Sequence, residues 1–347
     1  GLRITREGVP VAGADGINAS AAVLGTSTFD DLWVEGHYDG VSLGVTDYSF
    51  VNQVMSQRNY RDGFRIANVG TNGQCQWNLH QCFAQFNDGA GYIVKSGSET
   101  GQITIGNWDS CGTFANTGKG MTFEGTANMP IQGARLHNCY VGDDNGGAGI
   151  YFDTYGTFHR VTSSFVELIG RGLSGRLYNT AATNTGPGIW ATANNNALTV
   201  SDTRIDSCSY DGIQSGARAF NASGCDITDN GLAGTANRRN GIKLITGTSY
   251  ASIMGGTSGH RGAGTSQQYA VEALSATGTT IMGIAAMNLT AGLVTGALPN
   301  LIGNTIAGHF IVSDGVVLGS ATGGNKGAGT LNTSGDQYKN NTAFVNP

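Results

Sequence analysis

The segment Gly120-Met121-Thr122-Phe123-Glu124 is repeated in kind as Gly149-Ile150-Tyr151-Phe152-Asp153. In both segments a glycine precedes a large apolar residue, and apolar and polar residues then alternate. Alternation with a period of two is typical of a short β-strand with one buried face. The two anchor residues, Met121 and Ile150, are 29 positions apart. Repetition at such a distance is the sequence signature of a solenoid.

The same pair of a glycine and an apolar anchor recurs along most of the chain, and Ala270-Val271 continues the series. The anchors are Val41, Phe64, Tyr92, Met121, Ile150, Leu173, Ile213, Ile242 and Val271, with offsets of 23, 28, 29, 29, 23, 40, 29 and 29. A second register ends at Cys82, Cys111, Cys139, Phe165, Cys208 and Asn230, and a third begins near Ile103, Ile131, Phe158, Leu198, Phe220, Ile253 and Ile281. Three short strands per turn predict an all-β fold, a right-handed single-stranded parallel β-helix.

Composition excludes several other classes. Gly accounts for 56 of the 347 residues, which disfavours helical bundles, and only 5 Pro argue against collagen. A hydrophobic content of 39 % excludes disorder. The net charge of −5 is scattered, so we expect no nucleic-acid partner. The sequence contains no run of roughly 18 to 20 apolar residues, so we expect no membrane insertion. Neutral Ser, Thr, Asn and Gln side chains suit hydroxyl-rich ligands.

The repeat predicts three zones. Residues 1–30 are expected to form an N-terminal neck or cap, residues 31–300 the parallel β-helix, and residues 301–347 a C-terminal β segment. The 40-residue offset between Leu173 and Ile213 predicts an inserted loop that contains Trp190. Such a loop on a rigid scaffold is a place for ligand contact, or equally a cover over a coil or a neighbouring subunit.

The cysteines are expected to be structural. Four of them, at 82, 111, 139 and 208, are predicted to occupy one coil position as a ladder of reduced thiols. Strand spacing is wider than the Cβ separation that a disulfide prefers. No Cys-x-x-Cys pair exists, so we expect no zinc, no other metal and no cofactor.

The chain resembles phage tailspikes and tail fibres with pectate-lyase-like β-helices. The resemblance rests on irregular coils after a short neck and on the C-terminal motif Gly324-Asn325-Lys326-Gly327-Ala328-Gly329-Thr330-Leu331-Asn332, followed by Tyr338-Lys339-Asn340. It implies a parallel homotrimer in the virion tail, extracellular, with phage tail or baseplate proteins and a bacterial surface polysaccharide as partners. The charge-free segment 273–313 would suit a three-fold interface.

One row of side chains is a candidate catalytic site. Counting three residues on from successive anchors gives Lys95, Glu124, Asp153 and Arg176 as outward neighbours. Glu124 and Asp153 are expected roughly 5 Å apart, near the spacing of the two carboxyl groups in a retaining glycosidase, with one pKa raised by repulsion. Tyr151 and Trp190 could contact sugar rings, and Lys95 and Arg176 could bind substrate. The alternative is a solvated ladder of alternating charge.

A second constellation is formed by His80, Asp109 and His137, which are expected to share one coil position. An Asp between two imidazoles could orient a base or hold a metal, or could be a hydrogen-bonded ladder at a turn.

The sequence therefore predicts a phage tailspike or tail fibre that recognises capsule or O-antigen. It could also depolymerise that polysaccharide by glycosidic hydrolysis. The alternatives are a non-enzymatic adhesin or structural fibre, and a secreted polysaccharide lyase.

Overall fold

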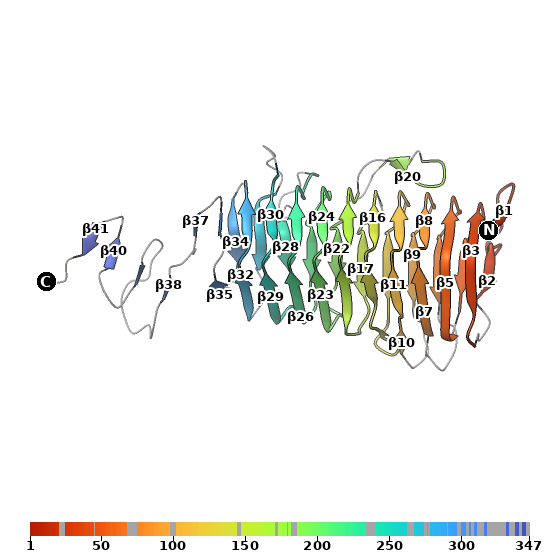
Figure 1. Ribbon diagram of the computed structural model, residues 1–347, viewed down its shortest axis with the longest axis horizontal. Helices are drawn as coiled ribbons and strands as arrows, with labels where there is room; N and C mark the ends of the chain where they lie inside the picture. Colours follow the sequence, from red (N-terminus) through yellow and green to blue (C-terminus); the bar gives the residue numbers. More distant parts are fainter. Residues whose placement is uncertain are drawn as a thin grey trace.

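The protein forms a single stack of β-coils in a computed structural model (Figure 1). The structure describes residues 1–20, 25–44, 46–67, 75–97, 102–143, 147–170, 173–178, 180–181, 186–233, 240–261, 267–273, 276, 278–289 and 291–296, and beyond these only the backbone of short strands between 300 and 344. All the regular elements in these parts of the chain are strands. The predicted right-handed parallel β-helix is confirmed.

Three parallel sheets run along the stack. The first sheet contains β2 (Ile17–Ala19), β4 (Val41–Leu43), β6 (Phe64–Ala67), β9 (Tyr92–Lys95), β13 (Met121–Glu124), β17 (Ile150–Asp153), β22 (Ile189–Ala191), β25 (Ile213–Ser215), β28 (Asn240–Leu244), β31 (Tyr269–Ala273) and β34 (Gly292–Gly296).

The second sheet contains β1 (Leu2–Thr5), β3 (Thr28–Glu35), β5 (Thr46–Gln57), β7 (Cys75–His80), β11 (Asn107–Asp109), β15 (Arg135–His137), β18 (His159–Thr162), β23 (Ala197–Ser201), β26 (Ala219–Ser223), β29 (Tyr250–Met254), β32 (Thr279–Met282) and β35 (Asn300–Ile302). The third contains β8 (Phe83–Gln85), β12 (Gly112–Phe114), β16 (Tyr140–Gly142), β19 (Phe165–Glu167), β24 (Arg204–Asp206), β27 (Asp226–Thr228), β30 (Thr257–Gly259), β33 (Ala285–Met287) and β36 (Thr305–Ile306). These two sheets are continuous, because β5 pairs with β7 along its first part and with β8 along its last.

The remaining strands lie outside these rows. They are the parallel pair β10 (Ile103–Thr104) and β14 (Ile131–Gln132), the antiparallel pair β20 (Leu173–Ser174) and β21 (Thr180–Ala181), β37 (His309–Phe310) beside β36, and the four-stranded group β38 (Val316–Val317), β39 (Leu331–Asn332), β40 (Gln337–Lys339) and β41 (Thr342–Phe344). Figure 1 shows β20 on a segment that projects from the stack.

The predicted anchors stack in register along the first sheet, with one exception. Met121 pairs with Tyr92 on one side and with Ile150 on the other. Beyond Ile150 the partner is Ile189, so the assignment of Leu173 as an anchor was wrong. Leu173 instead begins the antiparallel pair β20–β21. The chain inserts extra residues within this coil before Gly188 and Ile189 resume the pattern.

The glycine before each anchor is required by close stacking. A Cβ added to Gly91 would lie 2.1 Å from Thr113 Oγ1 and 2.8 Å from the carbonyl oxygen of Gly120 on the next coil. Any side chain at this position would therefore push adjacent coils apart.

The corner between the second and third sheets has a fixed backbone conformation. Its residues on successive coils have φ of 48° to 54°: Asp31, Gln53, Gln81, Ser110, Asn138, Ser163 and Asp202. Glycines 224, 255 and 283 continue the row with φ of 61° to 68°. One left-handed residue per coil turns the chain from one sheet to the next, which explains the abundance of Asn, Asp and Gly there.

Apolar side chains fill the interior as stacks. The Phe64 and Tyr92 rings are 4.7 Å apart with an interplanar angle of 7°, and those of Phe123 and Phe152 are 5.1 Å apart at 12°. Trp108 lies between the two pairs, 5.3 Å from Tyr92 and 5.2 Å from Phe123. Burial of each such side chain contributes roughly 1.5–3 kcal/mol, so this core holds the coils together.

An asparagine ladder occupies an interior corner. The side-chain oxygen of Asn87 accepts hydrogen bonds from the backbone N–H of Asn59 at 3.0 Å and from its amide at 2.8 Å. Asn87 in turn donates to Asn116 Oδ1 at 2.7 Å. All three asparagines are fully buried. The ladder satisfies polar groups at a corner where no strand pairing does so.

The described cysteines are free and buried, but the predicted ladder contained one wrong member. Cys82, Cys111 and Cys139 directly precede aligned strands of the third sheet. Cys225, which directly precedes β27, occupies the same position on a later coil. Cys208 lies instead at the asparagine corner, where its N–H donates to Asn230 Oδ1 at 3.1 Å. Burial raises the pKa of Cys139 to about 12 and that of Cys225 to about 11. These thiols are therefore poor nucleophiles.

Both ends of the chain continue the β architecture. Strands β1 and β2 pair with β3 and β4, so the segment predicted as a neck or cap supplies strands to the first coil. The zone boundaries at residues 30 and 300 stay predictions. The C-terminal motif lies outside the described residues apart from the backbone of β39 and β40, and the charge-free segment 273–313 is described through residue 296 with gaps and beyond it only as the backbone of β35, β36 and β37.

Candidate functional site

The first sheet carries two adjacent rows of outward-facing side chains. Because alternate residues of a strand face opposite sides, the second and the fourth residues of β13 and β17 point away from the core. One row contains Lys95, Glu124 and Asp153, which are direct Cα partners on consecutive coils. The other row runs through Ile93, Thr122, Tyr151, Trp190 and Gln214. The register predicted for the candidate carboxylates is therefore present.

Glu124 lies between two ammonium groups. Its Oε2 is 3.7 Å from Lys95 Nζ, and its Oε1 is 3.6 Å from Lys119 Nζ. The Glu124 side chain is 30 % exposed, so solvent screens both ion pairs and their contribution to stability is small. Their effect is to hold the carboxylate and its two cations together at the surface.

Asp153 is held by neutral groups from the next coil. Its Oδ1 accepts hydrogen bonds from Thr192 Oγ1 at 2.8 Å and from Asn194 Nδ2 at 2.7 Å. Thr192 directly follows β22, so it takes the ladder position after Asp153. Two donors fix the orientation of this carboxylate.

Tyr151 lies at the centre of the cluster. Its ring is 5.1 Å from that of Trp190 at an interplanar angle of 66°, and Lys119 Nζ lies 3.7 Å from its centroid. Burial, together with the negative charges of Asp153 and Glu124, raises the pKa of Tyr151 to about 12. The hydroxyl therefore stays protonated at neutral pH and can donate a hydrogen bond.

Two polar atoms beside Tyr151 have no hydrogen-bond partner among the described residues. They are the Thr122 hydroxyl, one coil before Tyr151, and the Trp190 indole Nε1, one coil after it. Buried polar groups in proteins are normally paired. Both atoms are buried and lie on the strands that flank Tyr151.

The structure corrects two of the predicted placements. Trp190 lies on β22, paired with Tyr151, and not in an inserted loop. Arg176 does not continue the ladder, because the segment 173–178 leaves the stack. Arg176 reaches back to an earlier coil, where its N–H donates to Asp88 Oδ1 at 2.7 Å and its guanidinium lies 4.2 Å from the Tyr60 ring centroid.

The second predicted constellation is also brought together. His80 Nδ1 lies 3.1 Å from Asp109 Oδ2, and His137 Nδ1 lies 2.7 Å from Asp109 Oδ1. The hydrogen bond from His137 lowers the pKa of Asp109 below its ordinary value. All three side chains are exposed at the ends of strands, just before the left-handed corner. The described residues contain no group of His, Cys, Asp or Glu arranged to hold a metal ion.

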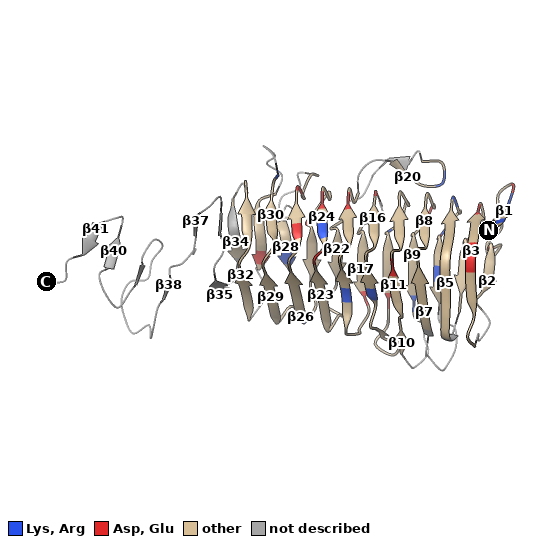
Figure 2. Ribbon diagram, viewed as in Figure 1, with Lys and Arg blue, Asp and Glu red and all other residues tan. Residues whose placement is uncertain are grey.

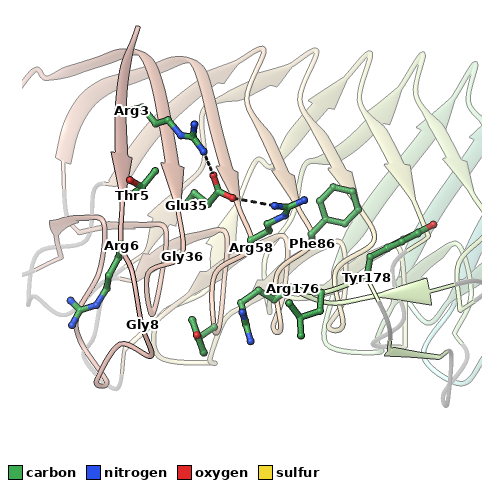
Figure 3. Close-up of a pocket in the computed structure, with 12 residues that line it drawn as sticks. Arg3, Thr5, Arg6, Gly8, Glu35, Gly36, Arg58, Phe86, Arg176 and Tyr178 are labelled. Carbon is green, nitrogen blue, oxygen red and sulfur yellow. Dashed lines mark hydrogen bonds and ion pairs between the residues drawn. The ribbon is translucent and has the colours of Figure 1, made fainter.

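A cleft lies near the N-terminal end of the stack, away from the ladder (Figure 3). Its volume is about 830 Å³, and it is lined by the first coils and by the projecting segment 173–178. It contains Arg176, the one predicted site residue that left the ladder.

Sequence reasoning missed Lys119, Thr192 and Asn194. Lys119 precedes the glycine of its coil, in Gly118-Lys119-Gly120, and a search for charged residues on both sides of each anchor would have found it. Thr192 and Asn194 were hidden by the choice of Leu173 over Ile189 as the anchor. The motif Gly188-Ile189-Trp190 fits the repeat and was the available signal.

Lys and Arg are interspersed with Asp and Glu along the described coils, as Figure 2 shows. The described residues contain no helix that is long and apolar enough to cross a membrane.

No protein-family model matches the chain, and no curated protein matches its sequence. Similar solved structures include tailspike protein 3 of bacteriophage CBA120, with 14 % identity, a TM-score of 0.49, and coverage of 95 % of this chain and 55 % of that one. The A-module of the mannuronan C-5 epimerase AlgE4 from Azotobacter vinelandii has 13 % identity, a TM-score of 0.38, and coverage of 81 % and 64 %.

A mutant of the periplasmic alginate epimerase AlgG has 11 % identity, a TM-score of 0.32, and coverage of 79 % and 76 %. The chain thus spans about half of the tailspike and less than two thirds of the AlgE4 module. These TM-scores lie below 0.5, and the fold follows from the strand pairing itself: the chain is a right-handed parallel β-helix that resembles tailspike and epimerase β-helices.

Proposed function

We propose that this chain is the polysaccharide-binding β-helix of a phage tailspike or tail fibre. The outward face of the first sheet would hold a bacterial capsule or O-antigen chain. The observation that carries the proposal is the contact of Tyr151 and Trp190, 5.1 Å apart, beside the charged ladder. Aromatic rings offer apolar faces to sugars, and flanking polar groups fix the orientation of the hydroxyls.

The polar groups beside the aromatic pair support the same surface. Sugar hydroxyls both donate and accept, so they suit the Tyr151 hydroxyl, which stays protonated, and the carboxylates of Glu124 and Asp153, which accept. The C-terminal motif, from Gly324 to Asn332, supports a viral setting. In that setting the chain works in the extracellular virion tail as a parallel homotrimer, attached to phage tail or baseplate proteins.

Glycosidic hydrolysis is a second candidate function, favoured by the register of Glu124 and Asp153. The strands of adjacent coils are spaced by ~4.8 Å, and the carboxyl groups of a retaining pair by ~5 to 5.5 Å. Asp153, oriented by two donors, would be the nucleophile. Glu124 would be the acid, and its lysine partners would have to release it first. Because of that requirement, binding is the primary proposal.

Binding is tested with a panel of purified capsules and lipopolysaccharides from different bacteria. We expect wild type to bind at least one of them, and Tyr151→Ala and Trp190→Ala to bind it about tenfold or more weakly, as buried aromatic anchors do in interfaces. Tyr250→Ala is the matched control, since this tyrosine is 64 % exposed on β29 of the second sheet. Unchanged affinity in both first-sheet variants would contradict the proposal.

Cleavage is tested in the same panel by release of reducing ends, with absorbance at 235 nm recorded for lyase products. Glu124→Gln and Asp153→Asn should abolish product and retain binding if the ladder is catalytic. Asp30→Asn, a change at an exposed strand position of the second sheet, is the control. Binding by wild type without any product would leave a non-enzymatic receptor-binding protein.

A further inference from the structure

The cleft at the N-terminal end is built from segments that are far apart in the sequence. Its floor comes from Arg3 and Arg6, Glu35, and Arg58 with Tyr60, which belong to successive coils. Its far wall comes from Arg176, Leu177 and Tyr178 on the projecting segment. A volume of about 830 Å³ is within the usual range of sites for small molecules and short oligomers.

The projecting segment is fixed against the earlier coils by specific contacts. Gly175 N–H donates to the carbonyl of Ala115 at 2.9 Å, and Arg176 N–H donates to Asp88 Oδ1 at 2.7 Å. The Tyr178 ring meets Phe86 edge-on at 5.4 Å. The wall of the cleft is therefore held in place by three separate contacts.

Positive charge exceeds negative charge in the cleft. Of the described residues that line it, four are arginines and one, Glu35, is acidic, while Asp88 pairs with Arg176 from outside the lining. Glu35 forms ion pairs with two of the arginines, Arg3 and Arg58, drawn as dashed lines in Figure 3. Arg3 Nη2 lies 2.8 Å from Glu35 Oε2, and Arg58 Nη1 lies 3.5 Å from Glu35 Oε1. The side chains of Arg3 and Arg58 are 64 % and 55 % exposed, so much of each guanidinium faces solvent.

The other two arginines are not neutralised by Glu35. Arg6 forms no ion pair with any described residue, while its backbone N–H is tied to the carbonyl of Glu35 at 3.2 Å. Arg176 Nε forms an ion pair with Asp88 Oδ2 at 3.5 Å and is buried without a hydrogen-bond partner in the described part of the chain. The cleft thus holds the Arg6 guanidinium, which no described residue pairs, beside three arginines that are ion-paired.

Aromatic side chains lie beside these donors. The Arg176 guanidinium lies over the Tyr60 ring, 4.2 Å from its centroid. Phe86 and Tyr178 also line the cleft. Tyr178 is 43 % exposed. A ligand that fits would have an anionic group for the guanidinium forks and an apolar ring face for the aromatics.

We propose that this arginine cleft is a second glycan site, one that binds an anionic saccharide by its acidic group. A sugar acid has both required features in one ring, the charge at its edge and C–H groups on its face. The inference rests on the proposed function in that it takes the ligand to be a glycan. It adds a class of sugar and a location that the aromatic pair on the first sheet does not specify.

The test measures affinity by calorimetry with three tetrasaccharides: tetragalacturonate, a sulfated heparin tetrasaccharide, and neutral maltotetraose. We expect an acidic probe to bind and the neutral one not to bind. The tighter of the two acidic probes identifies carboxylate or sulfate as the preferred group. Binding should weaken as salt is raised, because the ion pairs are partly exposed.

Arg6→Gln and Arg176→Gln should each weaken acidic-probe binding about tenfold or more. The Arg6 side chain forms no hydrogen bond or ion pair with a described residue, so Arg6→Gln tests the site without disturbing the fold. Arg160→Gln, at an exposed position of β18, is the control. Failure of both acidic probes to bind, or binding that Arg6→Gln leaves unchanged, would overturn the inference.

The two proposals fail separately. Loss of surface-polysaccharide binding in Tyr151→Ala, with no binding of acidic tetrasaccharides by wild type, would leave the first-sheet surface and remove the arginine cleft. Binding of an acidic tetrasaccharide that depends on Arg6, with surface-polysaccharide binding unaffected by Tyr151→Ala and Trp190→Ala, would do the reverse.

Discussion

Replacing Asn87 with alanine should destabilise the solenoid by breaking its asparagine ladder. The side chain is fully buried and its oxygen is the acceptor for two donors of Asn59. Asn59 Nδ2 keeps its 3.1 Å bond to Ser56 Oγ, but the Asn59 backbone N–H has no other hydrogen bond to a described residue. Asn116 Oδ1 still accepts from the backbone of residue 87 at 3.0 Å.

The magnitude follows from the donors that lose their acceptor. Each buried hydrogen-bonding group left unpaired costs about 1–3 kcal/mol. The Asn59 N–H and one hydrogen of its amide are affected, so the free energy of unfolding should fall by about 2–6 kcal/mol. That is a large fraction of the stability of a typical domain.

The assay is urea denaturation followed by the fluorescence of the fully buried Trp77 and Trp108. Asn221→Ala, at an exposed position of β26, is the matched control and should change stability by less than about 0.5 kcal/mol. If Asn87→Ala unfolds at the same urea concentration as Asn221→Ala, then the ladder does not stabilise the coils and the reasoning is refuted.

Three further predictions concern the core and the buried ionisable groups. Phe123→Ala removes a ring stacked 5.1 Å from Phe152 and should cost about 3–5 kcal/mol in the same denaturation assay; a loss below 1 kcal/mol would contradict the packing. Burial raises the pKa of Asp211 to about 6 from 3.8, so the folded state binds a proton more readily than the unfolded chain. The resulting stabilisation, about 3 kcal/mol, is present below pH 3.8 and lost as the pH rises through 6. Asp211→Asn should remove that part of the pH dependence of the free energy of unfolding between pH 4 and 7. If the free energies of wild type and variant change in parallel with pH, the assignment to Asp211 is refuted. Cys139, with a pKa of about 12, should resist alkylation at pH 8 in the native protein, as read by peptide mass spectrometry; rapid native labelling would show that the site is open.

Much of the fold could be predicted because the coil repeats a local pattern. The glycine before each anchor is dictated by contact with the next coil, and the alternation after it is dictated by the two faces of a strand. Both constraints act on neighbouring residues and are visible in the sequence. Stacking then makes the register of Lys95, Glu124 and Asp153 a matter of counting.

Counting failed where an insertion interrupts a coil. Both Leu173 and Ile189 follow a glycine, and spacing alone cannot tell which of them continues the sheet. The choice of Leu173 displaced Arg176 into the ladder and Trp190 out of it. Similarly, Cys208 and Cys225 both precede plausible strands, and only the pairing of β24 with β27 separates the two corners.

The arginine cleft could not be predicted from the sequence. Its residues come from the first coils, from Phe86, and from a segment that starts at residue 173. They meet because the projecting segment folds back along the stack, and that path depends on side-chain contacts such as those of Arg176 with Asp88 and Tyr60. No periodicity records such contacts.

The most direct test of the account is hydroxyl-radical footprinting of the protein with and without a surface polysaccharide that it binds. The account predicts that oxidation of Tyr151 and Trp190, the aromatic pair on the first sheet, falls when the polysaccharide is bound. Tyr250, exposed on the second sheet, should be oxidised equally in both states. Unchanged oxidation of Tyr151 and Trp190 in the saturated complex would contradict the central claim that this face binds the glycan.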